Sequence, residues 1–462
     1  MPDHSRRSFL KAVGSAGVST ALVSGAASAN QSGSPNQRFL IDLDEIARSE
    51  VPNDVEIIHD ISQIGILAAR GDPNTVPGAA STMPDVEVYQ NGPVKEHDAT
   101  GHGSKGPAWD SGEPTNTELQ WDKREQRVGD LTERPDNRRV VHDTTKGEGT
   151  RVAVVDTGVY DGHPDLDSVV NDELSENFTT DQYDWRPNGA GDHGTHVAGI
   201  IAATNDGGDG VLGTAPETEI VAHRVFSGVE GEGATTGDTI AALAAAADKG
   251  CDAANFSVGY IDYDVEEHPY LLDIKEMYAD LADYAHSKGM TIINSTGNAG
   301  LDMTPENTLS LPTEVDGIFG VSATGPIGFL WDDKQPSREV KAIHKLEEPT
   351  DYPARYTNYG TGVDVSAAGG NYDPDAIDEV PGWYYDLVLS SIVQYDDAGN
   401  PVAGYGWKAG TSMAAPQVTG AYALVRSLRP DASAQEVEAL IKETAQSAPG
   451  GELYHGAGHL DL

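Results

Sequence analysis

Cysteine is almost absent from the chain, because Cys251 is the only one among 462 residues. A single cysteine excludes any disulfide within the chain, so the fold must be held by packing and polar contacts. Cys251 lies in the segment KGCDAANFSVG, between a helical run and a strand-like run. This position predicts a small buried hydrophobic side chain rather than a nucleophile.

Basic residues are scarce as well. The chain has 30 Lys and Arg against 74 Asp and Glu, which gives a net charge of −44. Nucleic acids and anionic lipids bind basic surfaces, so neither is expected as a partner. A high charge of one sign is typical of disordered chains, but long apolar segments with regular spacing recur between residues 150 and 462. Because salt at about 1 M shortens the Debye length to about 3 Å, the composition favours a folded protein adapted to high salt.

A long hydrophobic run is also missing, so no membrane span is expected. The N-terminal segment MPDHSRRSFLKAVGSAGVSTALVSGAASA comes nearest, but it is too rich in Gly, Ser and Ala. Arg6 and Arg7 precede its mild apolar part, and Ala27-Ser28-Ala29 ends it. This layout predicts a twin-arginine signal peptide over residues 1–29 and export of a folded chain. The alternative is a chance arginine pair before an amphipathic helix.

The remainder of the chain divides into three regions by composition. Residues 30–90 contain strand-like runs such as RFLIDL and DVEVYQN, which predict a small α+β unit. Residues 91–117 are polar and rich in Gly and Pro, which predicts a linker open to cleavage. Strand and helix signals alternate over residues 118–462. Such alternation predicts an α/β domain, in which helices flank a mostly parallel sheet.

Three segments of this domain place reactive side chains where strands end or helices begin. TRVAVVDTG ends near Asp156, GDHGTHVAGI presents His193, and GTSMAAP presents Ser412 ahead of an apolar run. Taken alone, Ser412 is explained equally well as a helix N-cap. A serine hydroxyl becomes a nucleophile when a histidine takes its proton and a buried aspartate orients that histidine. In open α/β sheets such groups meet at the carboxyl ends of the strands.

The segments VVDTGV, HGTHVAG and GTSMAAP together resemble the three active-site motifs of subtilisin-like serine proteases, in the order Asp, His, Ser. The resemblance covers roughly residues 118–462. It implies that Ser412 is the nucleophile, His193 the general base and Asp156 the residue that orients it. It also implies that residues 30–90 are an inhibitory propeptide of a zymogen. With its acidic composition and export signal, the chain resembles the halolysin-type secreted proteases of haloarchaea.

The same resemblance assigns residues to the substrate cleft. NSTGNAG resembles the segment that supplies a side-chain amide to the oxyanion, although such an asparagine is by itself a common turn residue. NFSVG resembles the strand along which substrate binds by strand addition. Nothing charged falls near the base of the first pocket, so a broad preference for apolar or aromatic side chains is expected. The cleft residues implied are Asn298 for the oxyanion, and Ser257, Val258, Gly259 and Ser310 for the substrate.

Structural calcium is the one cofactor that the resemblance implies. Asp165 in YDGHPDL matches a carboxylate ligand, and TNDGGDGVLG matches the calcium loop of the family but is one residue longer. Oxygen-only ligands suit Ca²⁺. The alternative is an acidic surface loop in an acidic protein. The ligands implied, besides Asp165, are the side chain of Asp206 and the backbone oxygens of Thr204, Asp209 and Val211.

Zinc is not expected, because His193 and His196 are three residues apart and lack the spacing and glutamate of a zinc-protease helix. His196 is expected to be a packed helix residue. Another departure from the family is Gln417, where histidine is usual. The segments 261–275 and 325–352 look like insertions beside the core. No organic cofactor is implied.

Three functions remain open from the sequence. The leading one is a secreted serine endopeptidase that acts as a monomer on protein or peptide substrates and is first bound by its own propeptide. A processing protease for a few specific partners would differ only in the selectivity of its pockets. A non-enzymatic binding protein is less favoured, because it has no need of a nucleophile, a base, an orienting carboxylate and an oxyanion donor together.

Overall fold

The computed structural model describes most of the chain, and Gly33–Leu462 form one compact unit. The described residues are 37–78, 81–98, 115–129, 140–206, 208, 210–331, 338–377 and 379–462. The expected signal peptide, residues 99–114 of the expected linker, and Asp209 lie outside them.

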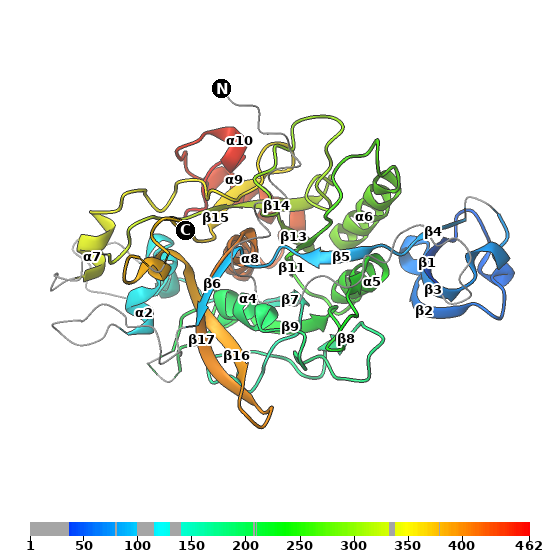
Figure 1. The fold of residues 1–462 in the computed structure, drawn as a ribbon, viewed down its shortest axis with the longest axis horizontal. Coiled ribbons are helices and arrows are strands. Elements are labelled where there is room, and N and C mark those ends of the chain that lie inside the picture. Colours follow the sequence, from blue (N-terminus) through cyan, green and yellow to red (C-terminus); the bar gives the residue numbers. More distant parts are fainter. Residues whose placement is uncertain are drawn as a thin grey trace. The chain divides into compact units, whose positions relative to one another are not determined.

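A seven-stranded sheet lies at the centre of this unit (Figure 1). Its strands are β7 (Arg151–Asp156), β8 (Glu176–Asn177), β9 (Glu219–Arg224), β11 (Ala253–Phe256), β13 (Thr291–Ser295), β14 (Ile318–Thr324) and β15 (Val365–Ala368). They lie in the order β15-β14-β13-β11-β7-β9-β8, and every neighbouring pair is parallel. The predicted parallel α/β sheet is therefore confirmed.

Helices cover both faces of the sheet. Val152 and Val154 of β7 pack into one core with the helices α4 and α8, whereas Ala153 and Val155 pack into a second core with α5 and α6. Successive strand residues point to opposite faces, so a strand between two helix layers is apolar along its whole length. The four covering helices are α4 (His193–Ala202), α5 (Thr236–Asp248), α6 (Tyr270–Ser287) and α8 (Thr411–Leu428).

Further helices and 3-10 turns complete this part of the chain. They are α2 (Asn116–Leu119), α3 (Trp121–Glu125), α7 (Arg338–Ile343), α9 (Ala434–Thr444), α10 (Glu452–His455) and the 3-10 turns η5 (Val141–Asp143) and η6 (Trp383–Asp386). The segment 261–275 forms turns and the start of α6, and the described part of 325–352 contains α7. Cys251 is buried, as predicted, and burial raises its pKa to about 12. No helix among the described residues is both long and apolar enough to cross a membrane.

A buried polar cluster joins α3 to α8 at Gln417. The Lys123 ammonium has no exposed surface and donates to the Gln417 side-chain oxygen, while the Gln417 amide donates to Asp122 at 2.8 Å. Burial lowers the pKa of Lys123 to about 8. A glutamine can accept from the buried lysine and donate to the carboxylate at once, which accounts for glutamine at this position.

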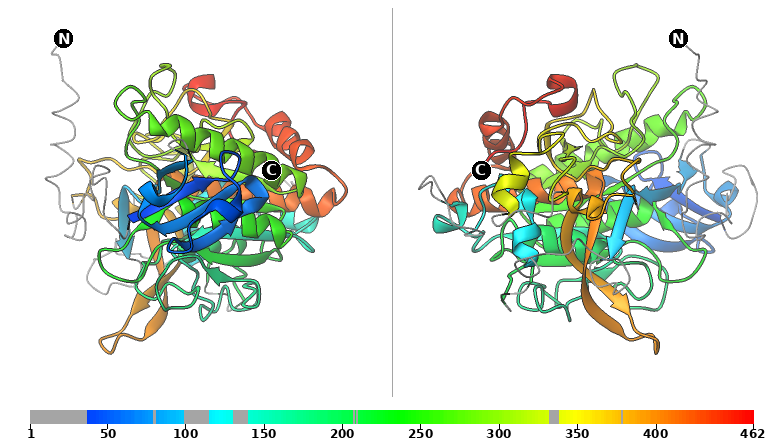
Figure 2. Two further views of the ribbon diagram at one scale, coloured as in Figure 1. Left: turned by 90° about the vertical axis from the view of Figure 1, so that its right-hand side faces the viewer. Right: turned by 60° about the vertical axis from the view of Figure 1, so that its left-hand side comes forward.

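Residues 37–84 form a four-stranded antiparallel sheet, which we call the leader sheet, in the order β2-β3-β1-β4. One face has a small core of its own, which includes Phe39 and Ile41. Leu40 and Ala68 on the other face pack into the α5–α6 core, and Figure 2 shows the sheet over these helices. Its elements are β1 (Gln37–Asp42), β2 (Glu56–Ile61), β3 (Ile66–Gly71), β4 (Thr82–Pro84) and the 3-10 turns η2 (Arg48–Glu50), η3 (Ser62–Ile64) and η4 (Pro73–Thr75).

The chain leaves the leader sheet as two short strands. β5 (Glu87–Gln90) lies between β10 (Ala234–Thr235) and β12 (Val258–Gly259), antiparallel to both. β6 (Lys95–Asp98) pairs with β17 (Pro401–Ala409), which forms a long hairpin with β16 (Val388–Tyr395) (Figures 1 and 2). The start of the expected linker is therefore a strand rather than an exposed loop, because the edge of β17 satisfies its backbone hydrogen bonds.

A buried ion cluster fixes the leader sheet to α5. The Arg38 guanidinium lies 2.8 Å from Asp85 and 2.7 Å from Asp238, and His59 lies 2.8 Å from Asp238. Both carboxylates are almost completely buried, and burial raises the pKa of Asp85. Asp238 is in the first turn of α5, where the helix dipole also favours a negative charge.

Replacing Arg38 should loosen the leader sheet. Arg38→Met leaves two buried carboxylates without their guanidinium, which costs about 3 kcal/mol. We expect faster amide hydrogen exchange over residues 37–71, measured on a Ser412→Ala background that removes the expected nucleophile. Arg48→Met is the control, because its ion pair with Asp60 is half exposed and such pairs contribute about 0–1 kcal/mol. Equal effects of the two changes would show that the buried cluster does not hold the sheet.

Candidate active site

Asp156 and His193 meet at the carboxyl end of β7. His193 Nδ1 lies 2.9 and 2.8 Å from the two carboxylate oxygens of Asp156. Both side chains are buried. Because a carboxylate only accepts, Nδ1 carries the ring proton and Nε2 is left as an acceptor. His193 Nε2 is buried and has no hydrogen-bond partner in the described part of the chain, so it is free to take a proton.

Gly194 allows α4 to begin close to β7. A Cβ atom at this position would lie 2.3 Å from the Gly158 carbonyl oxygen and 3.1 Å from the Asp156 Cβ. The Thr157 hydroxyl accepts the Gly194 N–H at 2.9 Å, which ties the two segments together. The glycine of the HGTHVAG motif thus permits this tight approach.

Ser412 lies in the first turn of α8 and is completely buried. Its hydroxyl donates to the backbone carbonyl of Asn91. The Asn298 side-chain amide donates to the same carbonyl oxygen at 2.8 Å, and to that of Gly92 at 2.8 Å. The two residues, far apart in the sequence, therefore converge on one carbonyl group of the chain.

Thr411 fixes the direction of the Asn298 side chain. Asn298 Oδ1 accepts from the Thr411 N–H at 2.9 Å and from its hydroxyl at 2.8 Å. Because the oxygen is held in this way, the amide nitrogen must face the carbonyl of Asn91. No separate sequence signal pointed to Thr411, although it stands beside Ser412 in the GTSMAAP motif.

The segment from Glu87 to Asn91 lies along the strand that was expected to bind substrate. Gln90 pairs with Val258 and Tyr89 with Gly259 in an antiparallel ladder. The Asn91 N–H donates to the Ser257 carbonyl at 2.9 Å. The structure therefore places all three expected strand residues beside one extended segment of the same chain.

Ser310, the remaining expected pocket residue, is buried. Its hydroxyl donates to the Thr296 carbonyl at 3.4 Å, and its N–H donates to the Glu314 carboxylate at 2.6 Å. Burial raises the pKa of Glu314 to about 7. Ser310 thus supports the segment after β13, and Ser295 forms the hydrogen bonds to the Asn91 side chain.

The chain continues along β17 beyond Gly92. The Val94 N–H donates to the Ala409 carbonyl at 2.8 Å, and β6 then pairs with β17. Glu96 lies 2.9 Å from the Lys408 ammonium, and the His97 ring stacks on Tyr384 with 4.0 Å between ring centroids. These contacts were not predicted, because neither the β16–β17 hairpin nor η6 carries a recognisable sequence motif.

His196 is a packed helix residue. It is completely buried, its Nε2 lies 3.1 Å from the Gly406 carbonyl, and burial lowers its pKa well below the usual range. A ring that stays neutral suits this packing position. Among the described residues, no group of three or more His, Cys, Asp or Glu side chains is arranged to hold a metal.

Asp165 nevertheless faces the expected calcium loop. Its carboxylate accepts the Val211 N–H at 3.0 Å, and its backbone carbonyl accepts the Thr204 N–H at 3.0 Å. A Cβ atom at Gly210 would lie 2.1 Å from Asp165 Oδ1, so the loop backbone is pressed against the carboxylate. Burial, with a smaller contribution from Asp206, raises the pKa of Asp165. A carboxylate oxygen is the kind of ligand that a hard cation such as Ca²⁺ prefers.

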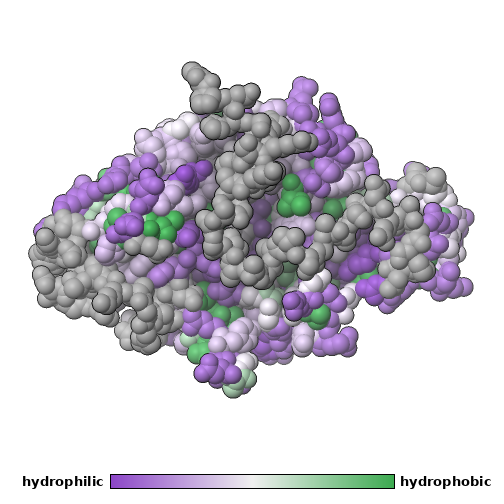
Figure 3. Space-filling model, in the orientation of Figure 1, coloured by the Kyte–Doolittle hydropathy of each residue, from purple (hydrophilic) through white to green (hydrophobic). Residues whose placement is uncertain are grey.

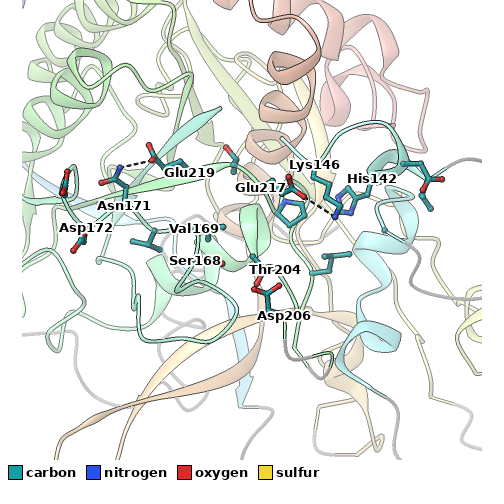
Figure 4. Close-up of a pocket in the computed structure, with 18 residues that line it drawn as sticks. His142, Lys146, Ser168, Val169, Asn171, Asp172, Thr204, Asp206, Glu217 and Glu219 are labelled. Atoms are coloured by element: carbon teal, nitrogen blue, oxygen red, sulfur yellow. Dashed lines mark hydrogen bonds and ion pairs between the residues drawn. The ribbon is translucent and has the colours of Figure 1, made fainter. Parts of the chain in front are cut away.

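A pocket of about 880 Å³ lies away from these catalytic candidates. Thr204 and Asp206 line it side by side (Figure 4). Glu219, the first residue of β9, also lines it, so the pocket is at the amino-terminal edge of the sheet. None of the residues expected in catalysis lines this pocket.

A parallel sheet that carries a buried Asp–His pair, and a serine and an amide directed at one carbonyl, is typical of a serine protease of the α/β type. The chain belongs to the Subtilase family, whose model matches residues 147–459. The thermophilic serine proteinase of Bacillus sp. strain AK1 is 31% identical over 320 residues, which are 69% of this chain and 62% of that protein. Thermitase of Thermoactinomyces vulgaris is 28% identical over 323 residues, which are 69% of this chain and 89% of thermitase.

A solved structure shows the same fold. Fervidolysin from Fervidobacterium pennivorans, a keratinolytic enzyme related to subtilisin, matches with a TM-score of 0.63 at 20% identity. The match covers 92% of this chain and 60% of the fervidolysin chain. This chain therefore spans less than two thirds of both fervidolysin and the Bacillus proteinase.

Proposed function

We propose that this chain is a secreted serine endopeptidase, made as a zymogen and adapted to high salt. One observation carries the proposal: the carbonyl of Asn91 receives hydrogen bonds from both the Ser412 hydroxyl and the Asn298 amide. A carbonyl held between a nucleophile and an amide donor is in the position of a scissile bond. The substrates are proteins or peptides that bind as strands, as the segment around Asn91 does.

The proposed reaction is acyl transfer to Ser412. The Ser412 hydroxyl turns from the Asn91 carbonyl to His193 Nε2 and gives up its proton as Oγ bonds to the carbonyl carbon. Asn298 stabilises the negative oxygen, and loss of such a donor costs about 10² to 10³ in kcat. His193 then returns the proton to the leaving nitrogen as the C–N bond breaks, and Asp156 stabilises the charged imidazole. Water, deprotonated by His193, releases the acyl group.

The zymogen proposal follows from which residues occupy the cleft. Residues 1–29 are the signal peptide, 30–90 the inhibitory propeptide, 91–117 the linker and 118–462 the peptidase domain. The leader sheet packs on α5, and the chain after it fills both sides of the candidate site. Cleavage between Asn91 and Gly92, at the start of the linker, would separate the propeptide from the domain.

Self-cleavage tests this proposal directly. In about 3 M NaCl, where screening is nearly complete, the wild-type precursor should lose residues up to Asn91 and then cleave casein. Ser412→Ala should stay whole and inert, because no nucleophile remains. Intact mass gives the site, and a remaining domain lighter by one glycine would place the cut after Gly92 instead. If Ser412→Ala is cleaved like the wild type, Ser412 is not the nucleophile. If wild type stays whole and inert though folded, a processing protease that needs its own partner, or a binding protein, becomes the better hypothesis.

Adaptation to high salt is supported by the net charge of −44. The face seen in Figure 3 is mainly hydrophilic wherever it is coloured, with small separate apolar areas. Repulsion among carboxylates opposes folding until salt screens it. We propose export by the twin-arginine pathway, as in halolysin-type enzymes. This pathway carries folded chains, which suits a protein of this composition that folds in salt.

Stability should therefore rise with salt. We expect the urea midpoint of Ser412→Ala to increase steeply between about 0.1 and 3 M NaCl, a range over which the Debye length falls from about 10 Å to below 3 Å. Sucrose, which strengthens burial without screening charge, is the control. Full stability at about 0.1 M NaCl, or an equal gain in sucrose, would rule out screening as the cause.

Calcium is proposed as a structural ion beside Asp165. Asp165 and Asp206 would hold it through their side chains, and Thr204, Asp209 and Val211 through backbone oxygens. A bound cation would compensate the buried carboxylate and stiffen the loop before β9. A structural ion stabilises the folded state according to its affinity and concentration.

Removal of calcium tests this site without reference to activity. A chelator should lower the unfolding temperature of the wild-type chain, and added Ca²⁺ should restore it. Asp165→Asn keeps the shape of the side chain but removes its charge, so its unfolding temperature should no longer respond to chelator. Asp167→Asn, an exposed neighbour, should respond like wild type. A wild-type chain with the same unfolding temperature in chelator would contradict the site.

A further inference from the structure

We propose that the pocket for the residue before the scissile bond selects asparagine, so that the substrates are polypeptides with Asn at that position. The proposal rests on the proposed function of the cleft. It replaces the preference for apolar or aromatic side chains that was expected from the absence of charge. The side chain of Asn91 occupies this pocket in the structure, and its contacts carry the inference.

The Asn91 amide is bound by Ser295 at the end of β13. Asn91 Nδ2 lies 3.0 Å from the Ser295 carbonyl oxygen and 3.0 Å from the Ser295 hydroxyl. A carbonyl oxygen can only accept, so the atom that faces it must be an N–H donor. Ser295 is completely buried, and Asn91 is the one partner of its hydroxyl among the described residues.

The backbone of two glycines makes the pocket narrow, so that it suits a short, flat side chain. A Cβ atom at Gly259 would lie 3.0 Å from Asn91 Oδ1 and 3.3 Å from Nδ2. A Cβ atom at Gly297, where φ is +101°, would lie 3.8 Å from Asn91 Oδ1. The backbone on both sides thus comes close to the carboxamide. A larger aromatic side chain would have to displace one of these walls.

Side chains of similar size differ sharply in the hydrogen bonds that they can form with Ser295. Leucine fills the space but leaves a buried hydroxyl and part of a buried carbonyl without a partner, which lowers binding about tenfold to a hundredfold. Aspartate places an anionic oxygen against the Ser295 carbonyl, where both atoms only accept. The pocket should therefore reject aspartate more strongly than leucine.

Self-cleavage by itself would not require such a pocket. A bond held within the same chain reacts at a high effective concentration, so even a poorly matched side chain can be cut. Ser295, however, belongs to the peptidase domain and remains after the propeptide leaves. Its buried oxygen atoms then favour a substrate side chain that donates hydrogen bonds, and this selectivity acts on other polypeptides.

Three quenched peptides test the proposal with mature wild-type enzyme in about 3 M NaCl, where screening is nearly complete. They carry the sequence of residues 86–96 with Asn, Leu or Asp at the position of Asn91. We expect kcat/KM for the Asn peptide to exceed that for Leu by about tenfold or more, with Asp lowest. Equal rates, or a faster Leu peptide, would overturn the asparagine proposal while leaving the protease function intact. Cleavage of none of them would overturn the proposed function and this proposal with it.

The Ser295→Ala variant tests whether Ser295 causes the preference for asparagine over leucine. The ratio of kcat/KM for the Asn and Leu peptides should fall several-fold, because one of the two acceptors is lost while the backbone carbonyl remains. Ser322→Ala is the matched control, since Ser322 is equally buried on β14 but donates to the Tyr454 carbonyl. If the ratio of kcat/KM for the Asn and Leu peptides changes equally in both variants, or in neither, Ser295 does not determine the preference for asparagine.

Discussion

Because the seven strands of the central sheet run parallel, their carboxyl ends fall along one edge, and the candidate site depends on that edge. β7 ends at Asp156 and β13 ends at Ser295, three residues before Asn298. The helices α4 and α8 begin beside them with His193 and Ser412 in their first turns. Hydrogen bonds from one helix start to the next strand end, such as that from Thr411 to Asn298, then set the side-chain directions.

The sequence was sufficient for the parts of the site that local motifs encode. Asp156 lies at a visible strand end and His193 and Ser412 lie at visible helix starts, each with a glycine close by. The parallel sheet followed from the alternation of apolar runs. Its outline could be predicted because strands buried on both faces are apolar throughout.

Contacts between distant segments could not be predicted in this way. Gln417 looked like a departure from the family, and only the fold shows the buried Lys123 and Asp122 beside it. The asparagine selectivity that we propose could not be predicted for a similar reason. The expected preference for apolar side chains was inferred from missing charge, whereas a hydroxyl and a backbone carbonyl at Ser295 contact the Asn91 amide, and amino-acid composition says nothing about the position of a backbone carbonyl. The β17 edge, which pairs with β6, likewise gave no periodic signal.

High salt distinguishes between the contacts that hold the leader sheet. Exposed pairs such as Arg48–Asp60 are screened when the Debye length is a few ångströms. The Arg38 cluster is buried between the sheet and α5, so ions reach it poorly and its attraction persists. Apolar contacts, including Leu40 and Ala68 against the helices, do not depend on screening at all. In the zymogen that we propose, a propeptide held by buried ions and apolar packing would therefore stay on the domain at high salt, so its release would come from cleavage after Asn91 rather than from a change in ionic strength.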